Sequence, residues 1–232
     1  MVVRTDILRQ NSKYLLPIAV LAAVCFNNWL LGPWLNHRLF VHNGSVSEFS
    51  SLDQPHYIIF RTLDIFSGLL SILLAILLSQ YLNKRSSWRH ILLWSLAILG
   101  LANVMDATFT LHCSETLDPN CTIPVSLSPG HFELPDHAYS SVVIAICYLV
   151  MPLAGFIYGR ANRFHLLAGF SILAIAVAIA SLVSASVGYL NNGSFSVRTS
   201  GLGQEVQMIV VGLWLVILVT DIYQRFRLSP EK

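Results

Sequence analysis

Charged side chains are scarce in this chain of 232 residues: Asp, Glu, Lys and Arg together make up 11% of it, against 55% hydrophobic residues. A water-soluble domain carries about 25% charged residues, so this shortage excludes a soluble globular enzyme. A nucleic-acid-binding surface is excluded too, because the 14 Lys and Arg leave a net charge of only +2 and form no basic patch. The class that remains is an integral membrane protein.

Several catalytic motifs are missing as well. The sequence contains no HExxH zinc motif, no GxSxG nucleophile motif and no phosphate-binding P-loop. The absence of a P-loop speaks against nucleotide-driven transport by this chain alone. Any activity must therefore be sought in individual polar residues.

Long apolar runs, in contrast, are abundant. A bilayer core requires about 20 mostly apolar residues per helix, and six segments meet that length: 15–35, 56–82, 91–111, 139–158, 166–189 and 205–223. We therefore predict an all-α, polytopic bundle of six transmembrane helices that forms one domain over residues 1–232. Gly32-Pro33 predicts a kink in the first span.

Basic residues are distributed unevenly between the predicted loops. Eleven of the 14 Lys and Arg lie at the two termini or in the loops after the second and fourth spans, which leaves Arg38, Arg61 and Arg198 for the other side. Cytoplasmic loops carry the excess of Lys and Arg. We therefore predict a protein of the inner or plasma membrane with both termini in the cytoplasm (N-in/C-in) and the lipid bilayer as its first partner.

Two predicted exoplasmic loops contain local structural signals. Cys113 and Cys121 lie in the loop 112–138, where an oxidising compartment favours a disulfide between them. In the loop 36–55, the run Ser45-Val-Ser-Glu48 matches a capping box and predicts a short surface helix.

Polar residues gather near the exoplasmic ends of the predicted spans. Asn103 and Asp106 lie on one stripe of the third span, because residues three apart share a helical face. Ionisable groups at membrane depth are costly and mark functional sites. We therefore predict an exoplasm-facing pocket that binds a ligand through six residues: Arg61, Asp64, Asn103, Asp106, His137 and Glu205. Among these, the candidates for a catalytic role are Asp106, His137 and Glu205.

Exoplasmic histidines raise the alternative of a zinc site. A catalytic Zn²⁺ requires three protein ligands and an open position for water. The candidate ligands are His112, His131 and His137, or Asp106 in place of His131. The competing interpretation is that these histidines are solvated in loops and that Asp106 forms an ion pair with Arg61.

Two further sets of residues concern packing between helices. The amides of Asn27 and Asn28 in the first span are expected to hydrogen-bond neighbouring helices or to line a polar cavity. In the fifth span, small residues recur at four-residue spacing. They predict either a tight seam inside the bundle or a contact face for a homo-oligomer or another membrane protein: Ala176, Ala180, Ser184 and Gly188.

Short motifs along most of the chain resemble those of the membrane-protein family called domain of unknown function 998. They include Leu31-Gly-Pro-Trp34, Ser47-Glu-Phe-Ser-Ser-Leu52, Phe60-Arg61, Asp64-Ile-Phe-Ser-Gly-Leu69, Asp106 before a cysteine-containing loop, Ser128-Pro-Gly-His131 to His137, and Gly201-Leu-Gly-Gln-Glu205. The resemblance covers about residues 15–225. It implies a multi-helix, bacterial-type inner-membrane protein with Arg61, Asp106, His137 and Glu205 in one exoplasmic site, and it implies no activity.

Three functions are compatible with these observations. The first is a membrane binding, sensing or accessory protein whose pocket recognises a lipid headgroup, a small polar ligand or a partner subunit. The alternative is a zinc-dependent membrane hydrolase that acts on a lipid or envelope substrate. The third is a proton-coupled carrier, against which the lack of a detectable inverted repeat counts.

Overall fold

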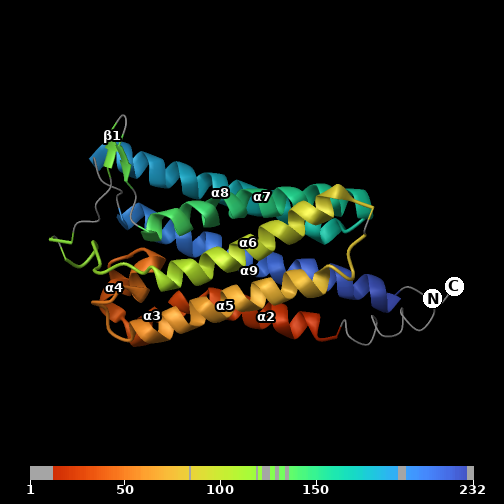
Figure 1. The fold of residues 1–232 in the computed structure, drawn as a ribbon, viewed down its shortest axis with the longest axis horizontal. Coiled ribbons are helices and arrows are strands. Elements are labelled where there is room, and N and C mark those ends of the chain that lie inside the picture. Colours follow the sequence, from red (N-terminus) through yellow and green to blue (C-terminus); the bar gives the residue numbers. More distant parts are fainter. Residues whose placement is uncertain are drawn as a thin grey trace.

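The computed structural model describes residues 13–83, 85–118, 120–121, 126–128, 131–133, 136–192 and 197–228, with side chains for 13–83, 85–118, 120–121, 137–184 and 201–225. Most of these residues belong to long helices that run side by side (Figure 1). The six longest elements are α2 (Leu15–Phe26), α5 (Tyr57–Leu78), α6 (Ser87–Thr108), α7 (Asp136–Asn162), α8 (His165–Asn192) and α9 (Val197–Leu228).

Shorter elements lie at the end of the bundle away from the start of α2 and the end of α9 (Figure 1). Between α2 and α5 the chain forms η1 (Asn28–Leu31), α3 (Gly32–Leu35), α4 (His37–Val41) and η2 (Val46–Ser50). Between α6 and α7, β1 (Ser126–Ser128) pairs with β2 (His131–Glu133) in a small antiparallel hairpin. The helical hydrogen bonds of η2 begin after Ser45, where the sequence predicts a capping box.

The long helices satisfy the requirements of a membrane protein. Five of them are long and apolar enough to cross a bilayer, and a sixth crossing results if Leu15–Phe26 and Asn28–Leu35, which meet at an angle of 59°, form one broken span. Large apolar side chains such as Trp94 and Val24 are exposed on the outside of the bundle, where a bilayer would cover them. The all-α membrane fold is confirmed, with five to six candidate spans.

The break in the first predicted span lies at Asn27 and not at Gly32-Pro33. Asn27 leaves the helical region with φ −98° and ψ 36°. Pro33 instead lies in the first turn of α3, where its missing amide hydrogen costs no helical hydrogen bond. The expected proline kink is therefore wrong in position, because a proline in a first turn begins a helix as readily as it bends one.

The six long helices form a closed ring. Each packs against its neighbours in chain order, and the first, α2, packs against the last, α9. Glycines allow the closest approach: Gly68 of α5 and Gly100 of α6 face each other so tightly that a Cβ atom on either would lie 2.5 Å from the other's carbonyl oxygen. The buried core contains Trp214, whose Nε1 donates to Ser171 Oγ at 2.8 Å and so joins α9 to α8.

The small residues of the fifth predicted span do not form a seam inside this ring. Ala176 and Ala180 are exposed on the surface of α8, whereas Ala174 and Ala178 are buried. The expected seam is therefore wrong for these two residues, because the buried face of α8 is the adjacent one. The burial of Gly188 is outside what the structure describes, and the alternative of an oligomer contact stays a prediction.

Candidate functional site

A cavity lies inside the helix ring, at the end covered by η2. Its volume is about 200 Å³. All six long helices contribute to its wall, together with two residues of η2: Phe26, Val46, Ser47, Asp64, Asn103, Asp106, Ser141, Ile144, Ala145, Tyr148, Ser181, Leu182, Gln204, Gln207 and Met208. The contact between α2 and α9 brings the first and last helices of the ring to the same cavity.

Three of the six predicted pocket residues line this cavity. Asp64 projects from α5, and Asn103 and Asp106 project from successive turns of α6, as the three-residue spacing predicts. Gln204 and Gln207, one turn apart on α9, line the same cavity. The structure thus brings two carboxylates and three amides from three helices to one polar cavity.

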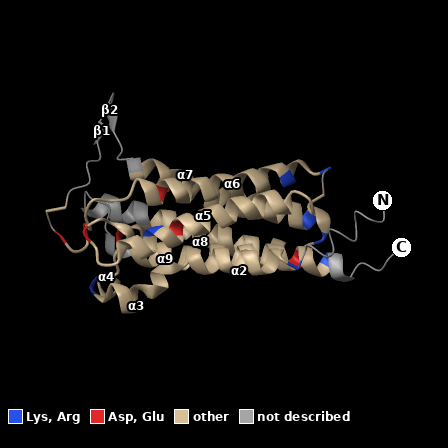
Figure 2. Cartoon of the chain, turned by 60° about the horizontal axis from the view of Figure 1, so that its bottom comes forward, with Lys and Arg blue, Asp and Glu red and all other residues tan. Residues whose placement is uncertain are grey.

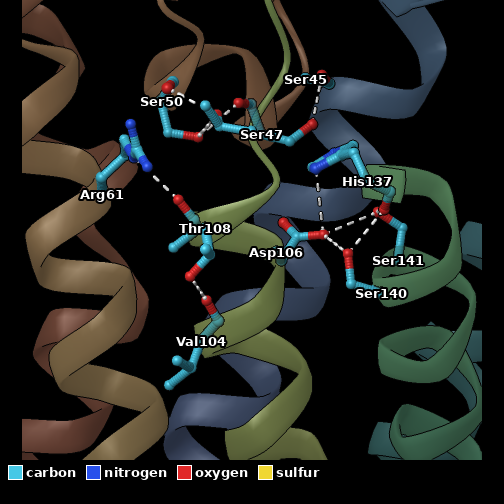
Figure 3. Close-up of polar contacts among 12 residues, drawn as sticks. Ser45, Ser47, Ser50, Arg61, Val104, Asp106, Thr108, His137, Ser140 and Ser141 are labelled. Atoms are coloured by element: carbon cyan, nitrogen blue, oxygen red, sulfur yellow. Dashed lines mark hydrogen bonds and ion pairs between the residues drawn. The ribbon is translucent and has the colours of Figure 1, made fainter. Parts of the chain in front are cut away.

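Asp106 binds the first two turns of α7 (Figure 3). Its Oδ1 atom accepts hydrogen bonds from Ser140 Oγ at 2.6 Å and Ser141 Oγ at 3.2 Å. The same oxygen lies 3.3 Å from Nδ1 of His137, and both side chains are largely buried. These contacts fix the carboxylate on one side and tie α6 to α7.

These residue types are those of a Ser-His-Asp triad, but their arrangement differs from one. In a triad the serine donates to the histidine ring, which the aspartate orients. Here both hydroxyls approach the aspartate and the carbonyl oxygen of His137. Ser140 and Ser141 therefore hold the Asp106 carboxylate in place, and neither donates to the imidazole as the serine of a triad does.

Asp64 of α5 is held by the segment that follows α2. Asn28 donates from Nδ2 to Asp64 Oδ1 at 2.6 Å and also lies 3.3 Å from the carbonyl oxygen of Phe60. The neighbouring Asn27 donates from Nδ2 to Ala23 O at 2.9 Å and to the carbonyl oxygen of Met208 on α9 at 3.3 Å. The expectation that these two amides bond to neighbouring helices is confirmed.

Asn103 is a polar side chain in the cavity wall with a buried atom that lacks a partner. It is 7% exposed, and within the described part of the chain its Nδ2 atom has no hydrogen-bond partner. A buried donor without a partner costs about 1–3 kcal/mol. An acceptor that enters the cavity would remove that cost.

The η2 segment covers the cavity and is anchored on both sides. Val46 donates its backbone amide to Gln204 Oε1 at 3.0 Å, which attaches the segment to α9. Gly201 of α9 packs closely against the turn that precedes η2. A Cβ atom on Gly201 would lie 2.3 Å from the carbonyl oxygen of Asn43 in that turn. This contact accounts for a glycine where α9 passes under the cover.

Glu48 attaches the other side of η2 to the loop after α6. Its carboxylate accepts hydrogen bonds from the backbone amide of Ser45 at 2.7 Å, from Ser114 Oγ at 2.9 Å, and from the amide and hydroxyl of Thr116, both at 2.8 Å. The capping box predicts the first contact. The other three follow only from the tertiary structure, and the sequence analysis missed them.

The disulfide predicted in this loop is confirmed. Cys113 and Cys121 are bonded, with their Cα atoms 5.9 Å apart, inside the usual range of about 4.4–6.8 Å. The remaining cysteines, Cys25 and Cys147, are buried thiols within helices. The disulfide therefore lies beside Ser114, at the point where Glu48 is bound.

Three predicted pocket residues lie outside the cavity wall. Arg61 donates from Nε to the carbonyl oxygen of Ala107 at 2.9 Å, at the end of α6 (Figure 3). The expected ion pair between Arg61 and Asp106 is therefore wrong: helix-end carbonyls lack intrahelical donors, so the guanidinium satisfies one of them.

His137 contacts the site through Asp106, and Glu205 lies between the lining residues Gln204 and Gln207. Their part in ligand binding stays a prediction.

The glutamines are the lining residues that the sequence analysis missed. Gln204 and Gln207 are three residues apart, so their side chains share one face of α9. Paired amides near the predicted exoplasmic end of an apolar span are an available signal, as Asn27 and Asn28 show. The ionisable residue between them, Glu205, was predicted in their place.

The zinc ligands proposed from the sequence are not assembled in the described residues. Within that part of the chain, no three His, Cys, Asp or Glu side chains come together in a group that fits a metal ion. This finding covers Asp106, His112 and His137. The side chain of His131 lies outside the described residues, so the set His112, His131 and His137 stays a prediction.

Comparison with known proteins gives one match. The model of the family described as "Protein of unknown function (DUF998)" matches residues 17–221. Neither the curated proteins nor the solved structures contain a match. Since the family model spans α2 to α9 and so includes every helix of the ring, the chain belongs to the DUF998 family of proteins of unknown function.

Proposed function

We propose that this membrane protein binds a small polar ligand, either free or as the headgroup of a lipid, in the cavity between α5, α6, α7 and α9. The observation that carries the proposal is the buried Nδ2 atom of Asn103, which lines the cavity and lacks a partner among the described residues. Buried polar groups are almost always satisfied. A ligand acceptor supplies the missing partner.

The two held carboxylates support a binding role in preference to a structural one. Asp106 and Asp64 each use an Oδ1 atom for contacts with the protein, and both side chains still line the cavity. A structural network would fill the space between them. Preformed cavities with a few convergent polar groups are the usual form of a small-molecule site.

We also propose one domain, inserted with both termini in the cytoplasm of the cell. Contact between α2 and α9 supports a single unit. The described basic residues support the orientation, because most of them lie at the end of the bundle where α2 begins and α9 ends (Figure 2): Lys13, Arg85, Arg89, Arg160, Arg163 and Arg225. Positive loops remain on the cytoplasmic side.

The binding proposal is tested with three solutes of similar size and different charge: ethanolamine, ethylene glycol and glycolate. Each is titrated against the purified protein in detergent while Tm is measured. We expect at least one to raise Tm in a saturable way, because a ligand that binds the native state at a hundred times Kd adds about 2.7 kcal/mol to its stability.

The variant Ala145→Phe places a bulky side chain in the cavity wall and should abolish this rise. Val142→Phe is the matched control, because Val142 lies on the same helix with its side chain exposed. If all three solutes leave Tm unchanged in the wild type, or if Ala145→Phe retains the full effect, the proposed function is wrong.

A further inference from the structure

We infer that the ligand is a small organic cation, an amine or ammonium group that carries an oxygen acceptor a few bonds away. The inference rests on the proposed binding function and names the class of ligand. It follows from the acidic side chains on the cavity wall, from the aromatic rings beside them and from the position of Asn103.

The ionisable side chains of the cavity wall are acidic. Asp64 and Asp106 line it, and within the described part of the chain no Lys, Arg or His belongs to the lining residues. His137 contacts Asp106 from the α7 side, so a charge on that imidazole offsets one carboxylate at most. Asp64 is bonded to the neutral amide of Asn28. An entering cation would pair with a carboxylate for which the lining residues supply no cationic partner.

Arg61, the basic side chain nearest in sequence to Asp64, is directed elsewhere. Its Nε atom donates to the carbonyl oxygen of Ala107 at 2.9 Å. Arg61 is also not one of the residues that line the cavity, so it supplies no positive charge to the cavity wall. This leaves the ligand itself as the source of positive charge.

Two aromatic residues complete the surroundings of the carboxylates. Phe26 of α2 and Tyr148 of α7 both line the cavity, with their ring centroids 6.2 Å apart and their planes nearly perpendicular. The faces of aromatic rings attract ammonium groups. Carboxylates beside aromatic rings therefore favour an organic cation over a neutral or anionic solute.

Asn103 and the size of the cavity define the rest of the ligand. An amide N–H donor cannot hydrogen-bond to an ammonium group, so the unpaired Nδ2 requires an oxygen on the same ligand. A water molecule requires only about 10–15 Å³ of such volume, whereas the cavity offers about 200 Å³. A single bare metal ion would leave most of that space unfilled, and a small amino alcohol matches both conditions.

The charge preference is tested by the affinities of the wild-type protein for ethanolamine, ethylene glycol and glycolate, measured by calorimetry or ligand-observed NMR. We expect ethanolamine to bind at least about tenfold more tightly than the other two, since an ion pair or charged hydrogen bond of about 1.5–3 kcal/mol corresponds to such a factor. Equal or tighter binding of ethylene glycol or glycolate would overturn the inference and leave the binding function standing. If none of the three solutes binds, the proposed binding function is itself wrong.

Matched variants locate the cation. Asp64→Asn and Asp106→Asn preserve shape and remove one charge each, and we expect each to weaken ethanolamine binding at least about fivefold. Asp118→Asn, in the loop after α6, removes the same charge outside the cavity and should leave the affinity unchanged. Unchanged binding in both cavity variants, with folding intact by Tm, contradicts the inference.

Asn103 is tested with a second probe. Ethylamine has the ammonium group of ethanolamine and lacks its oxygen. We expect Asn103→Leu to weaken ethanolamine binding by about three- to tenfold and to change ethylamine binding by less than about twofold. An equal loss for both probes would show that Asn103 does not recognise the oxygen.

The cation has two sources, a free amine or a lipid headgroup, and native mass spectrometry separates them. Delipidated protein is mixed with phosphatidylethanolamine or with phosphatidylglycerol that has the same acyl chains. A headgroup ligand predicts a retained phosphatidylethanolamine adduct that ethanolamine displaces and that Ala145→Phe prevents. A free amine predicts ethanolamine binding with no preference between the lipids. Preferential retention of phosphatidylglycerol would overturn the inference.

Discussion

Glu48 is a nearly fully buried carboxylate, 2% exposed, surrounded by hydrogen-bond donors from two loops. It joins η2, which covers the cavity, to the segment beside the Cys113–Cys121 disulfide through Ser114 and Thr116. A buried charge is tolerated when its hydrogen bonds are satisfied. Glu48 therefore holds the cover of the cavity in one position.

Removal of this carboxylate should destabilise the protein. Hydrogen bonds to a charged group contribute about 1.5–3 kcal/mol each, so we expect Glu48→Ala to lower the free energy of unfolding by at least about 3 kcal/mol. The measurement is chemical or thermal unfolding in detergent. As a control, Asp118→Ala removes an acceptor whose partner, the Asn120 amide, is exposed, and a surface change of this kind costs within about 0.5 kcal/mol. Similar losses in the two variants would refute the role assigned to Glu48.

Among the helices, α5 and α6 make the closest contact. Gly68 and Gly100 bring the two backbones together, and a Cβ on Gly100 would lie 2.5 Å from the carbonyl oxygen of Gly68. Association of helices in a membrane depends on such close packing, because lipid supplies little hydrophobic driving force. The same contact sets the distance between Asp64 and Asp106, which lie on α5 and α6 near this crossing.

A methyl group at the crossing should force the helices apart. We expect Gly100→Ala to reduce the free energy of unfolding by about 1–3 kcal/mol, the usual cost of overpacking, and to weaken ethanolamine binding. Gly169→Ala is the matched control, since a Cβ at Gly169 of α8 meets no atom within 4 Å. That control should be neutral or stabilising by up to about 1 kcal/mol, because alanine is the better helix former. If Gly100→Ala is as stable as Gly169→Ala, the close contact does not stabilise the pair.

For the molecule as a whole, orientation is the property that decides which compartment the cover of the cavity faces. We expect a cysteine at Asp118 to react with a membrane-impermeant maleimide in intact cells. A cysteine at Arg85 should react only after permeabilisation, because the two positions lie in loops at opposite ends of α6. Both variants are made in a chain with Cys25→Ser and Cys147→Ser. Labelling with the reverse pattern would place the termini outside the cell.

The sequence alone determined the class of protein and several local features. Scarce charge and long apolar runs lead to a helical membrane protein, since the polar backbone groups must find their hydrogen-bond partners within the chain when the bilayer supplies none. Short-range signals were equally decisive: the capping-box residues Ser45 and Glu48 lie at the start of η2, and Cys113 and Cys121 are bonded. Each of these features depends on residues close together in the chain.

The tertiary structure decided which side chains share the cavity. The long helices are apolar on every side, so no amphipathic pattern defines the face that turns inward, and the rotation of each helix follows from packing against its neighbours. That rotation places Gln204 and Gln207 on the cavity wall and leaves Glu205 off it. It also places Asp106 in contact with Ser140 of α7, whereas Arg61 contacts the backbone at the end of α6. These pairings join residues far apart in the chain, and the closed ring of helices is what brings them together.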